Sequence, residues 1–265
     1  MKVDGKIVVV TGGASGIGRA LAEHFAREGA AAVVVGDIDG PGAERVGEAI
    51  GGAGFACDVS READILHLIE QTEARYGPIG LFCSNAGILQ GLDRTSDHPA
   101  GAADELWARS WSVNVMAHVW AARALVPRMR ERGGGWFLHT VSAAGLLSQV
   151  GSAIYSTTKH AAIGFAENLA ISHRDHGIRV AILCPQGVDT AMIRQGPVGP
   201  AAFDGVLSPE DVAESVIRGL EAETFLILPH PQVLGYYRAK AENYDRWLGG
   251  MGKLQRLMRE RDPAG

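Results

Sequence analysis

The 265-residue chain is 46% apolar and 21% charged and has a net charge of −5. This composition is typical of a globular protein with room for one large α/β domain. The negative charge argues against a nucleic-acid-binding face, which needs clustered Lys and Arg, and no apolar run reaches the roughly 18–20 residues that span a bilayer. Because the N-terminus carries no signal-peptide pattern, we expect a cytoplasmic protein that binds neither nucleic acid nor membrane.

Seven short apolar runs alternate with six longer stretches of helical periodicity. The runs predict strands at residues 6–10, 32–35, 54–57, 81–84, 136–141, 180–184 and 225–228. The predicted helices are 16–28, 42–50, 61–76, 103–132, 152–176 and 209–221. Near-continuous apolar strands are typical of a parallel sheet that is buried on both faces. The alternation predicts an α/β fold, a single doubly wound Rossmann domain over residues 1–265 with a seven-stranded, mostly parallel sheet and helices on both faces.

Two stretches depart from this alternation. Residues 187–207 are rich in Gly, Pro and Ala, and they predict a long mobile loop that serves as an active-site lid. Residues 232–260 are charged and helix-periodic and contain Tyr236, Tyr237, Tyr244 and Trp247. This C-terminal extension predicts a helix packed across the domain, and an oligomer contact or a wall of a substrate pocket are the alternatives.

The metal-binding residue types show no pattern of a metal site. Cys57, Cys83 and Cys184 lie at or near the ends of apolar runs without C-x-x-C spacing, so we expect reduced, buried thiols. The nine histidines offer no H-E-x-x-H. We therefore predict no bound metal.

The Gly-rich segment 11–18, T-G-G-A-S-G-I-G, follows the first strand and opens the first helix. Such a turn lets the backbone approach a pyrophosphate, whose charge then lies at a helix N-terminus. Asp37 ends the second strand, nineteen residues past Gly18. A carboxylate there accepts hydrogen bonds from both adenosine ribose hydroxyls and repels a 2′-phosphate, so we predict NAD rather than NADP. The alternative is a solvated turn aspartate.

Polar residues also follow the third and fourth strands. Asp58, in Cys57-Asp58-Val59, could accept from an adenine amine or cap the next helix. Asn85-Ala86-Gly87 follows the fourth strand, and its small residues let the loop lie against a flat cofactor while the Asn amide braces the neighbouring backbone. All these residues fall at the edge where open α/β sheets bind ligands.

Tyr155 and Lys159 stand four residues apart in Y-S-T-T-K, and Ser142 precedes Tyr155 by thirteen residues. Side chains at i and i+4 lie on the same face of a helix. A phenol with its ordinary pKa of about 10 is a poor proton acceptor at neutral pH, but a neighbouring cation favours the phenolate. The pair predicts a proton-transfer site in which the pKa of the tyrosine is lowered.

These motifs, T-G-x-x-x-G-x-G at 11–18, N-A-G at 85–87, Ser142, and Y-x-x-x-K at 155–159, resemble those of the short-chain dehydrogenase/reductase family over roughly residues 5–190. The resemblance implies a Rossmann enzyme, usually a homotetramer or homodimer, that moves hydride between NAD(P) and a carbonyl or alcohol. The cofactor-binding residues that it implies are Gly12, Ser15, Gly16, Ile17, Asp37, Asp58, Val59, Asn85, Ala86, Gly87, Tyr155, Lys159, Pro185, Val188 and Thr190.

The resemblance also implies a catalytic set of Asn114, Ser142, Tyr155 and Lys159. Tyr155 would exchange a proton with the substrate oxygen, and Ser142 would donate a hydrogen bond to that oxygen. Lys159 would stabilise the phenolate and hold the nicotinamide ribose. Asn114, in S-V-N-V at 112–115, would help to position a water relay to the lysine.

The substrate side departs from the family pattern. Gln186 occupies a position that is normally Gly, and the long helix-prone tail is unusual. We expect eight mostly apolar residues to face the substrate, with no Arg or Lys among them: Leu89, Ala143, Ala144, Leu147, Val150, Gln186, Val188 and Met192. This lining predicts a neutral, hydrophobic secondary alcohol or ketone.

Two rival functions share these motifs. One is an NADPH-dependent ketoreductase, which Asp37 disfavours, and the other is a non-catalytic NAD-binding sensor, which the intact catalytic set disfavours. Helices 103–132 and 152–176 carry more apolar surface than one-sided burial needs, including Trp111, Trp120 and Phe165. We therefore expect a homotetramer or homodimer, the alternative being that these residues cover the sheet.

Overall fold

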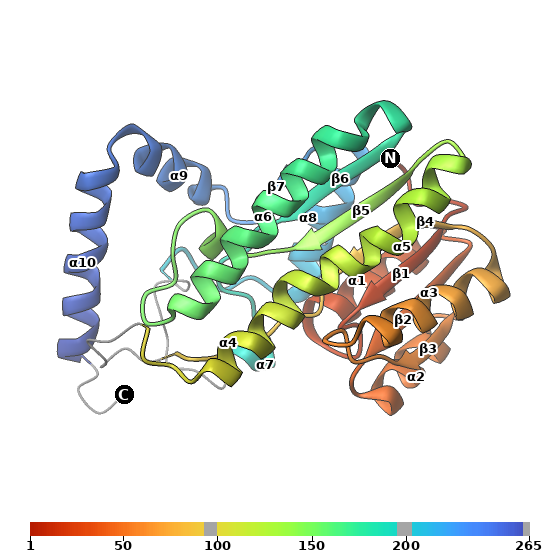
Figure 1. Ribbon diagram of the computed structural model, residues 1–265, viewed down its shortest axis with the longest axis horizontal. Coiled ribbons are helices and arrows are strands. Elements are labelled where there is room, and N and C mark those ends of the chain that lie inside the picture. The colour runs from red at the N-terminus through yellow and green to blue at the C-terminus, as the bar shows by residue number, and fades with distance from the viewer. Residues whose placement is uncertain (93–99, 195–202, 262–265) are drawn as a thin grey trace.

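The computed structural model describes residues 1–92, 100–194 and 203–261. Its centre is a sheet of seven parallel strands in the order β3-β2-β1-β4-β5-β6-β7 (Figure 1). The strands are β1 Ile7–Thr11, β2 Ala32–Asp37, β3 Ala53–Ala56, β4 Ile79–Ser84, β5 Gly135–Thr140, β6 Ile178–Leu183 and β7 Leu226–Ile227. The strand order reverses between β1 and β4, which confirms the predicted doubly wound α/β fold and creates a crevice at that point.

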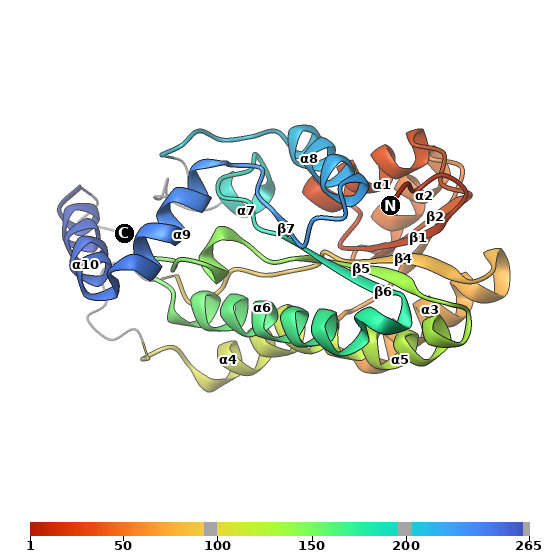
Figure 2. The ribbon, with the colours of Figure 1, turned by 90° about the horizontal axis from the view of Figure 1, so that it is seen from above.

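Helices cover both faces of the sheet (Figure 2). On one face lie α3 (Glu62–Tyr76), α4 (Asp104–Trp111), α5 (Ala117–Glu131) and α6 (Ala153–His173). On the other face lie α1 (Gly16–Arg27), α2 (Gly40–Ala49) and α8 (Pro209–Glu221). Ser208 starts α8 with a reciprocal capping box, in which its hydroxyl accepts from the Asp211 N–H.

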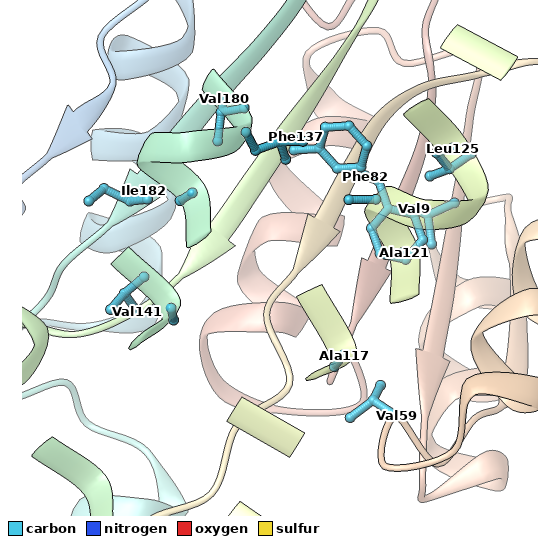
Figure 3. Close-up of a cluster of buried hydrophobic side chains, with 14 of the residues drawn as sticks. Val9, Val59, Phe82, Ala117, Ala121, Leu125, Phe137, Val141, Val180 and Ile182 are labelled. Carbon is cyan, nitrogen blue, oxygen red and sulfur yellow. The ribbon is translucent and has the colours of Figure 1, made fainter. Parts of the chain in front are cut away.

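The strands bury both of their faces, as their near-continuous apolar sequences predict. Successive residues Val8, Val9 and Val10 have no exposed surface, and they alternate between two hydrophobic clusters, one on each face of the sheet. Figure 3 shows one cluster, in which Phe82 and Phe137 pack with α5. Fully burying such a side chain contributes about 1.5–3 kcal/mol, so the sheet is a firm support for the loops at its edge.

The predicted helix 103–132 is interrupted. A π-helical turn, η1 (Ser112–Met116), joins α4 to α5 and contains Asn114. A π turn adds one residue to the helical circuit and occurs frequently at functional sites. Here it places the Asn114 side chain against the backbone of Ile88, where it makes two hydrogen bonds.

The predicted lid at 187–207 lies partly outside the described residues, because 195–202 are not among them. Its described part holds a short helix, α7 (Ala191–Arg194), and Val188 pairs in parallel with Leu207. The backbone at one end of the segment therefore pairs with the backbone at its other end.

The C-terminal extension is helical as predicted, but the expectation of one helix packed across the domain is wrong. It forms α9 (Gln232–Glu242) and α10 (Tyr244–Arg261), which stands apart from the sheet (Figure 1). Only Val233 and Lys240 of α9 are buried, and no described side chain of α10 is. Among the described helices, none combines the length and apolar character that crossing a membrane requires.

All three cysteines are free and buried, as their positions predict. Burial raises the pKa of the Cys57 and Cys184 thiols to about 12, and it raises the pKa of Cys83 as well. These groups are therefore neutral thiols that pack as small apolar side chains at neutral pH.

Candidate active site

A cavity of about 400 Å³ opens where the loops after β1, β4 and β5 meet. Ser142 lines it, and so do all fifteen residues predicted to bind the cofactor: Gly12, Ser15, Gly16, Ile17, Asp37, Asp58, Val59, Asn85, Ala86, Gly87, Tyr155, Lys159, Pro185, Val188 and Thr190. Asn114 does not line the cavity and is fully buried beside it. The structure thus gathers segments that are far apart in the sequence around one space.

The Gly-rich turn lies against the loop after β4. Gly12 has φ of +67°, and a Cβ there would lie 2.8 Å from the Cα of Ala86. At Gly18, a Cβ would lie 2.1 Å from the Gly12 carbonyl oxygen. The next helix, α1, starts after Ser15, whose side chain makes no capping hydrogen bond. The first N–H groups of α1 can therefore bind an anion such as a pyrophosphate.

Asp37 is fixed by the turn that it faces. One carboxylate oxygen accepts from the Ala14 N–H at 2.9 Å, and the other accepts from the Asp39 N–H at 3.0 Å. Asp37 therefore lines the cavity with both carboxylate oxygens held by backbone N–H groups, one of the Gly-rich turn and one of its own turn. Each carboxylate oxygen has a second lone pair that can accept from a ribose hydroxyl.

Asp58 organises the turn before α3. Its Oδ1 accepts from the Ser60 N–H at 3.0 Å and from the Ser60 hydroxyl at 2.7 Å, while its own N–H donates to Asp64 at 3.0 Å. The Asp58 carboxylate therefore orders the turn before α3 and does not cap the helix, whose N-cap is Arg61. Val59 lines the cavity beside it.

Asn85 braces three strands. Its amide nitrogen donates to the carbonyls of Thr11 at 3.0 Å and Gly12 at 3.3 Å, and its amide oxygen accepts from the Thr140 hydroxyl at 2.9 Å. The predicted bracing by this amide is thus present. A Cβ at Gly87 would lie 3.3 Å from Lys159 Nζ, so a small residue there keeps the ammonium accessible.

Ser142, Tyr155 and Lys159 converge in the cavity. The α6 helix begins just before Tyr155 because the Ser152 hydroxyl accepts from the Tyr155 N–H at 3.1 Å. Tyr155 is 9% exposed and Lys159 is 3% exposed, and Lys159 Nζ lies 5.5 Å from the centroid of the tyrosine ring. Ser142 follows β5 and makes a side-chain hydrogen bond with Tyr155. The two α6 side chains therefore share one face, as their spacing predicts.

The pKa of Tyr155 moves in the opposite direction from the sequence prediction. Burial raises the pKa of its phenol above the ordinary value, and the hydrogen bond with Ser142 only partly opposes this. Burial also lowers the pKa of Lys159, to about 8. The predicted lowering of the phenol pKa is therefore contradicted, because desolvation of the buried ring is the largest cause and outweighs the hydrogen bond with Ser142.

Asn114 supports the loop after β4. Its amide oxygen accepts from the Ile88 N–H at 2.9 Å, and its amide nitrogen donates to the Ile88 carbonyl at 2.9 Å and to the Thr158 hydroxyl at 3.2 Å. The side chain is therefore committed to holding the loop against α6. The water relay that the resemblance implies would have to use the Asn114 backbone instead.

The predicted substrate face is only partly correct. Gln186, Val188 and Met192 line the cavity, whereas five residues do not: Leu89, Ala143, Ala144, Leu147 and Val150. For Ala143 and Ala144 the physical reason is a 3₁₀ turn, η2 (Ala143–Gly145), which folds the chain after Ser142 against α6 and buries these two alanines. Alternation along an extended loop could not predict this turn.

Arg109 of α4 lines the cavity, although the residues predicted to face the substrate include no Arg or Lys. Val113 lies four residues further along and lines it too. Sequence reasoning missed both, because the π turn at Ser112–Met116 changes the register that regular helical spacing would give. Ile38 and Thr140 also line the cavity.

Gln186 fits its position without strain. Its φ is not positive, so glycine is not required there. Its backbone N–H donates to His230 Nδ1 at 3.2 Å. Its buried side-chain Oε1 has no hydrogen-bond partner within the described part of the chain. A buried acceptor of this kind fits an amide donor, such as the carboxamide of nicotinamide.

Comparisons with known proteins agree with this geometry. The family model for short chain dehydrogenases matches residues 6–197. The chain is 36% identical over 242 residues to 1-deoxy-11-beta-hydroxypentalenate dehydrogenase of Streptomyces exfoliatus, which covers 86% of this chain and 84% of the relative. It is 32% identical over 237 residues to epidermal retinol dehydrogenase 2 of Homo sapiens, covering 86% and 75% of the two chains.

Solved structures share the fold. A short chain dehydrogenase/reductase from Burkholderia phymatum, crystallised in complex with NAD, matches with a TM-score of 0.82 at 28% identity and covers 92% of this chain and 96% of the other. The fold, the family model and these relatives define an oxidoreductase with an α/β fold. The chain belongs to the short-chain dehydrogenase/reductase family.

Proposed function

We propose that this protein is an NAD-dependent dehydrogenase that interconverts a hydrophobic secondary alcohol and its ketone. The observation that carries the proposal is the convergence of Ser142, Tyr155 and Lys159 at the wall of the dinucleotide cavity. Scattered over the surface, these residues would have ordinary structural roles. Gathered around one space, they supply a proton donor, a cation and a hydrogen-bond donor to a single substrate oxygen.

Tyr155 moves the proton in this scheme. In ketone reduction its phenol protonates the forming alkoxide, and in alcohol oxidation its phenolate accepts the hydroxyl proton. Ser142 donates a hydrogen bond to the same oxygen, and Lys159 stabilises the phenolate. A nicotinamide cofactor held in this cavity would accept the hydride in alcohol oxidation and, in its reduced form, supply it in ketone reduction.

The preference for NAD rests on Asp37. Its carboxylate, held by the Ala14 and Asp39 N–H groups, is placed to accept from ribose hydroxyls and to repel a 2′-phosphate. The Gly-rich turn would hold the pyrophosphate, and the Gln186 amide oxygen would accept from the carboxamide. The related Burkholderia phymatum structure, in complex with NAD, supports this choice.

Val188 and Met192 give the substrate side of the cavity an apolar lining, which supports a neutral, hydrophobic substrate. The retinol dehydrogenase name of one relative is consistent with that class. Arg109 favours a second candidate, a hydrophobic alcohol that also bears a carboxylate. Arg109→Ala separates the two candidates, since it should weaken turnover of carboxylate-bearing alcohols about tenfold and leave neutral ones unchanged.

We also infer a homodimer or homotetramer. Trp111 is 42% exposed and Ile171 is 78% exposed, and large apolar side chains of this kind favour an interface with a second copy. Sedimentation of the purified protein tests this directly. A monomer at micromolar concentration would contradict it.

The test of the proposed activity is turnover with each cofactor. The purified protein is incubated with a panel of secondary alcohols and either NAD or NADP, and the absorbance of the reduced cofactor is followed. We expect NAD to be preferred at least tenfold in kcat/KM, and Asp37→Ser to reduce that preference because the repulsive carboxylate is lost.

Each rival function has its own outcome. A preference for NADP in the wild type would favour an NADPH-dependent ketoreductase. Tight NAD binding without turnover of any alcohol or ketone would favour a non-catalytic sensor. The apo-protein Kd for NAD, measured by fluorescence, separates loss of binding from loss of chemistry.

A further inference from the structure

The buried ammonium of Lys240 joins the C-terminal extension to the turn that follows Ser142. Lys240 is 5% exposed, and its Nζ donates to the carbonyls of Leu146 at 2.8 Å and Leu147 at 2.9 Å. These carbonyls follow the 3₁₀ turn η2, where a helical turn leaves its last acceptors without partners. A residue 93 or 94 positions away in sequence thus satisfies the end of this turn.

The same ammonium meets α6 and α10. Nζ lies 3.3 Å from His160 Nε2, and His160 Nδ1 lies 2.8 Å from the Ser156 carbonyl. That second contact assigns the proton to Nδ1, so Nε2 is an acceptor for the ammonium. Lys240 Nζ also lies 5.3 Å from the Tyr244 ring centroid and 4.8 Å from that of Trp247. All three N–H donors are used, and two aromatic faces of α10 stabilise the charge.

The turn that Lys240 holds continues directly from Ser142. The Ser142 hydroxyl accepts from the Ala144 N–H at 3.1 Å, and the Ser142 carbonyl accepts from the Gly145 N–H at 2.9 Å. The N–H groups of Leu146 and Leu147 donate to the Ala143 carbonyl at 3.0 and 2.8 Å. Consecutive hydrogen bonds therefore connect Leu146 and Leu147, whose carbonyls accept from Lys240, to Ser142.

We propose that Lys240 is a positioning residue for the dehydrogenase reaction, which fixes Ser142 by clamping the η2 turn to α9 and α10. The extension lies at the opposite end of the molecule from α2 (Figure 2), and none of its described residues lines the cavity. It acts on the reaction through the placement of the serine. The inference rests on the proposed function, because it gives Ser142 its role toward the substrate oxygen.

A double-mutant cycle tests whether Lys240 holds Ser142 in place through the η2 turn, an arrangement that we call the clamp. The variants are Lys240→Met, Ser142→Ala and the double variant, with Lys253→Met on the exposed surface of α10 as the matched control. Lys240→Met keeps the length of the side chain and removes the donors. We expect it to lower kcat/KM for a secondary alcohol about tenfold, because a misplaced catalytic group costs rate steeply. In the Ser142→Ala background the further loss should be less than twofold.

The controls define what contradicts the clamp. The Kd for NAD should stay within twofold in Lys240→Met, and Lys253→Met should match the wild type. Wild-type activity in Lys240→Met would overturn the proposal. An equal loss in both backgrounds would also overturn it, because Lys240 would then act independently of Ser142.

Hydrogen exchange keeps the clamp testable if the wild type turns over no alcohol. Exchange is measured at the amides of Gly145, Leu146 and Leu147, which are hydrogen-bonded in η2 and just after it. We expect at least about tenfold faster exchange in Lys240→Met than in Lys253→Met, with β1 unchanged. Equal exchange in the two variants would overturn the clamp, whereas inactivity with faster exchange would contradict only the proposed function.

Discussion

The active site and the C-terminal clamp each hold a buried lysine, and the two are buried in different ways. In the active site, Lys159 Nζ makes one hydrogen bond, to the Thr140 carbonyl at 3.2 Å, and faces the tyrosine ring. In the clamp, Lys240 has acceptors for all three of its N–H groups. Within the described residues, the Lys159 ammonium therefore has fewer hydrogen-bond acceptors than N–H groups. The Lys240 ammonium has an acceptor for each N–H group and holds separate backbone segments together.

The difference shows how this fold separates chemistry from support. An incompletely paired ammonium can stabilise charge that appears during a reaction, but its burial costs stability. A fully paired ammonium has no donor left for substrate and serves to hold backbone in place. The comparison predicts that removing the two charges has opposite effects on stability.

The largest effect is expected for Lys159→Met. We expect turnover to fall about 100-fold or more, because the phenolate loses its cation. The lowering of the Lys159 pKa from 10.5 to about 8 corresponds to about 3.5 kcal/mol at about 1.4 kcal/mol per pKa unit. Replacing the penalised charge with an apolar side chain should raise the free energy of unfolding at pH 7 by up to that amount, as measured by urea titration.

Lys159→Met should stabilise the fold relative to the wild type, and the size of this stabilisation should decrease as pH rises. Between about pH 8 and 10.5 the folded wild type has released the Lys159 proton while the unfolded chain still holds it. The unfolded state binds more protons there, so wild-type stability rises with pH through this window. The gap between the variant and the wild type should close above about pH 10.5, and a gap that is constant with pH would contradict the assignment.

Lys240→Met should act in the other direction. It leaves the carbonyls of Leu146 and Leu147 without their donor, which lowers the free energy of unfolding by about 1–3 kcal/mol. Lys253→Met, on the exposed surface, should change it by less than about 0.5 kcal/mol. A higher free energy of unfolding in Lys240→Met than in the wild type would contradict the predicted difference between the two lysines.

The smallest effect concerns a histidine pair below the active site. His118 and His139 are buried, with their Nδ1 atoms 3.0 Å apart, and burial lowers the pKa of His139 to about 3. The unfolded chain takes up a proton below about pH 6.5 that the folded His139 refuses, so its stabilising contribution is lost as pH falls. From pH 6.5 to 5.5 that loss is about 1 kcal/mol.

His139→Phe should remove this part of the acid sensitivity, and His67→Gln, at an exposed position, should retain it. Urea titrations of both variants at the two pH values measure the difference. Equal acid sensitivity in the two variants would show that His139 carries a proton in the folded state.

The sequence predicted the parts of the site that depend on local patterns. The buried strands are continuous apolar runs, and the loops that follow them must meet at one edge of a parallel sheet. Gly12 and Asp37 could be placed from this rule and from their spacing. Tyr155 and Lys159 followed from helical geometry alone, since an i,i+4 pair shares a face.

The parts that failed depend on contacts between distant segments. The η2 turn buries Ala143 and Ala144 because α6 covers them, and no local sequence pattern predicts that turn. Arg109 reaches the cavity through the register of a helix that a π turn interrupts. The direction of the phenol pKa was misjudged because burial raises it, and burial is a property of the whole fold.

Tyr155→Phe tests the central claim most directly. The variant keeps the ring and removes only the hydroxyl, so we expect the Kd for NAD to stay within twofold of the wild type. Turnover of a secondary alcohol should fall about 1,000-fold or more, because the hydroxyl that exchanges the proton with the substrate oxygen is lost. Turnover within tenfold of the wild type would contradict the account.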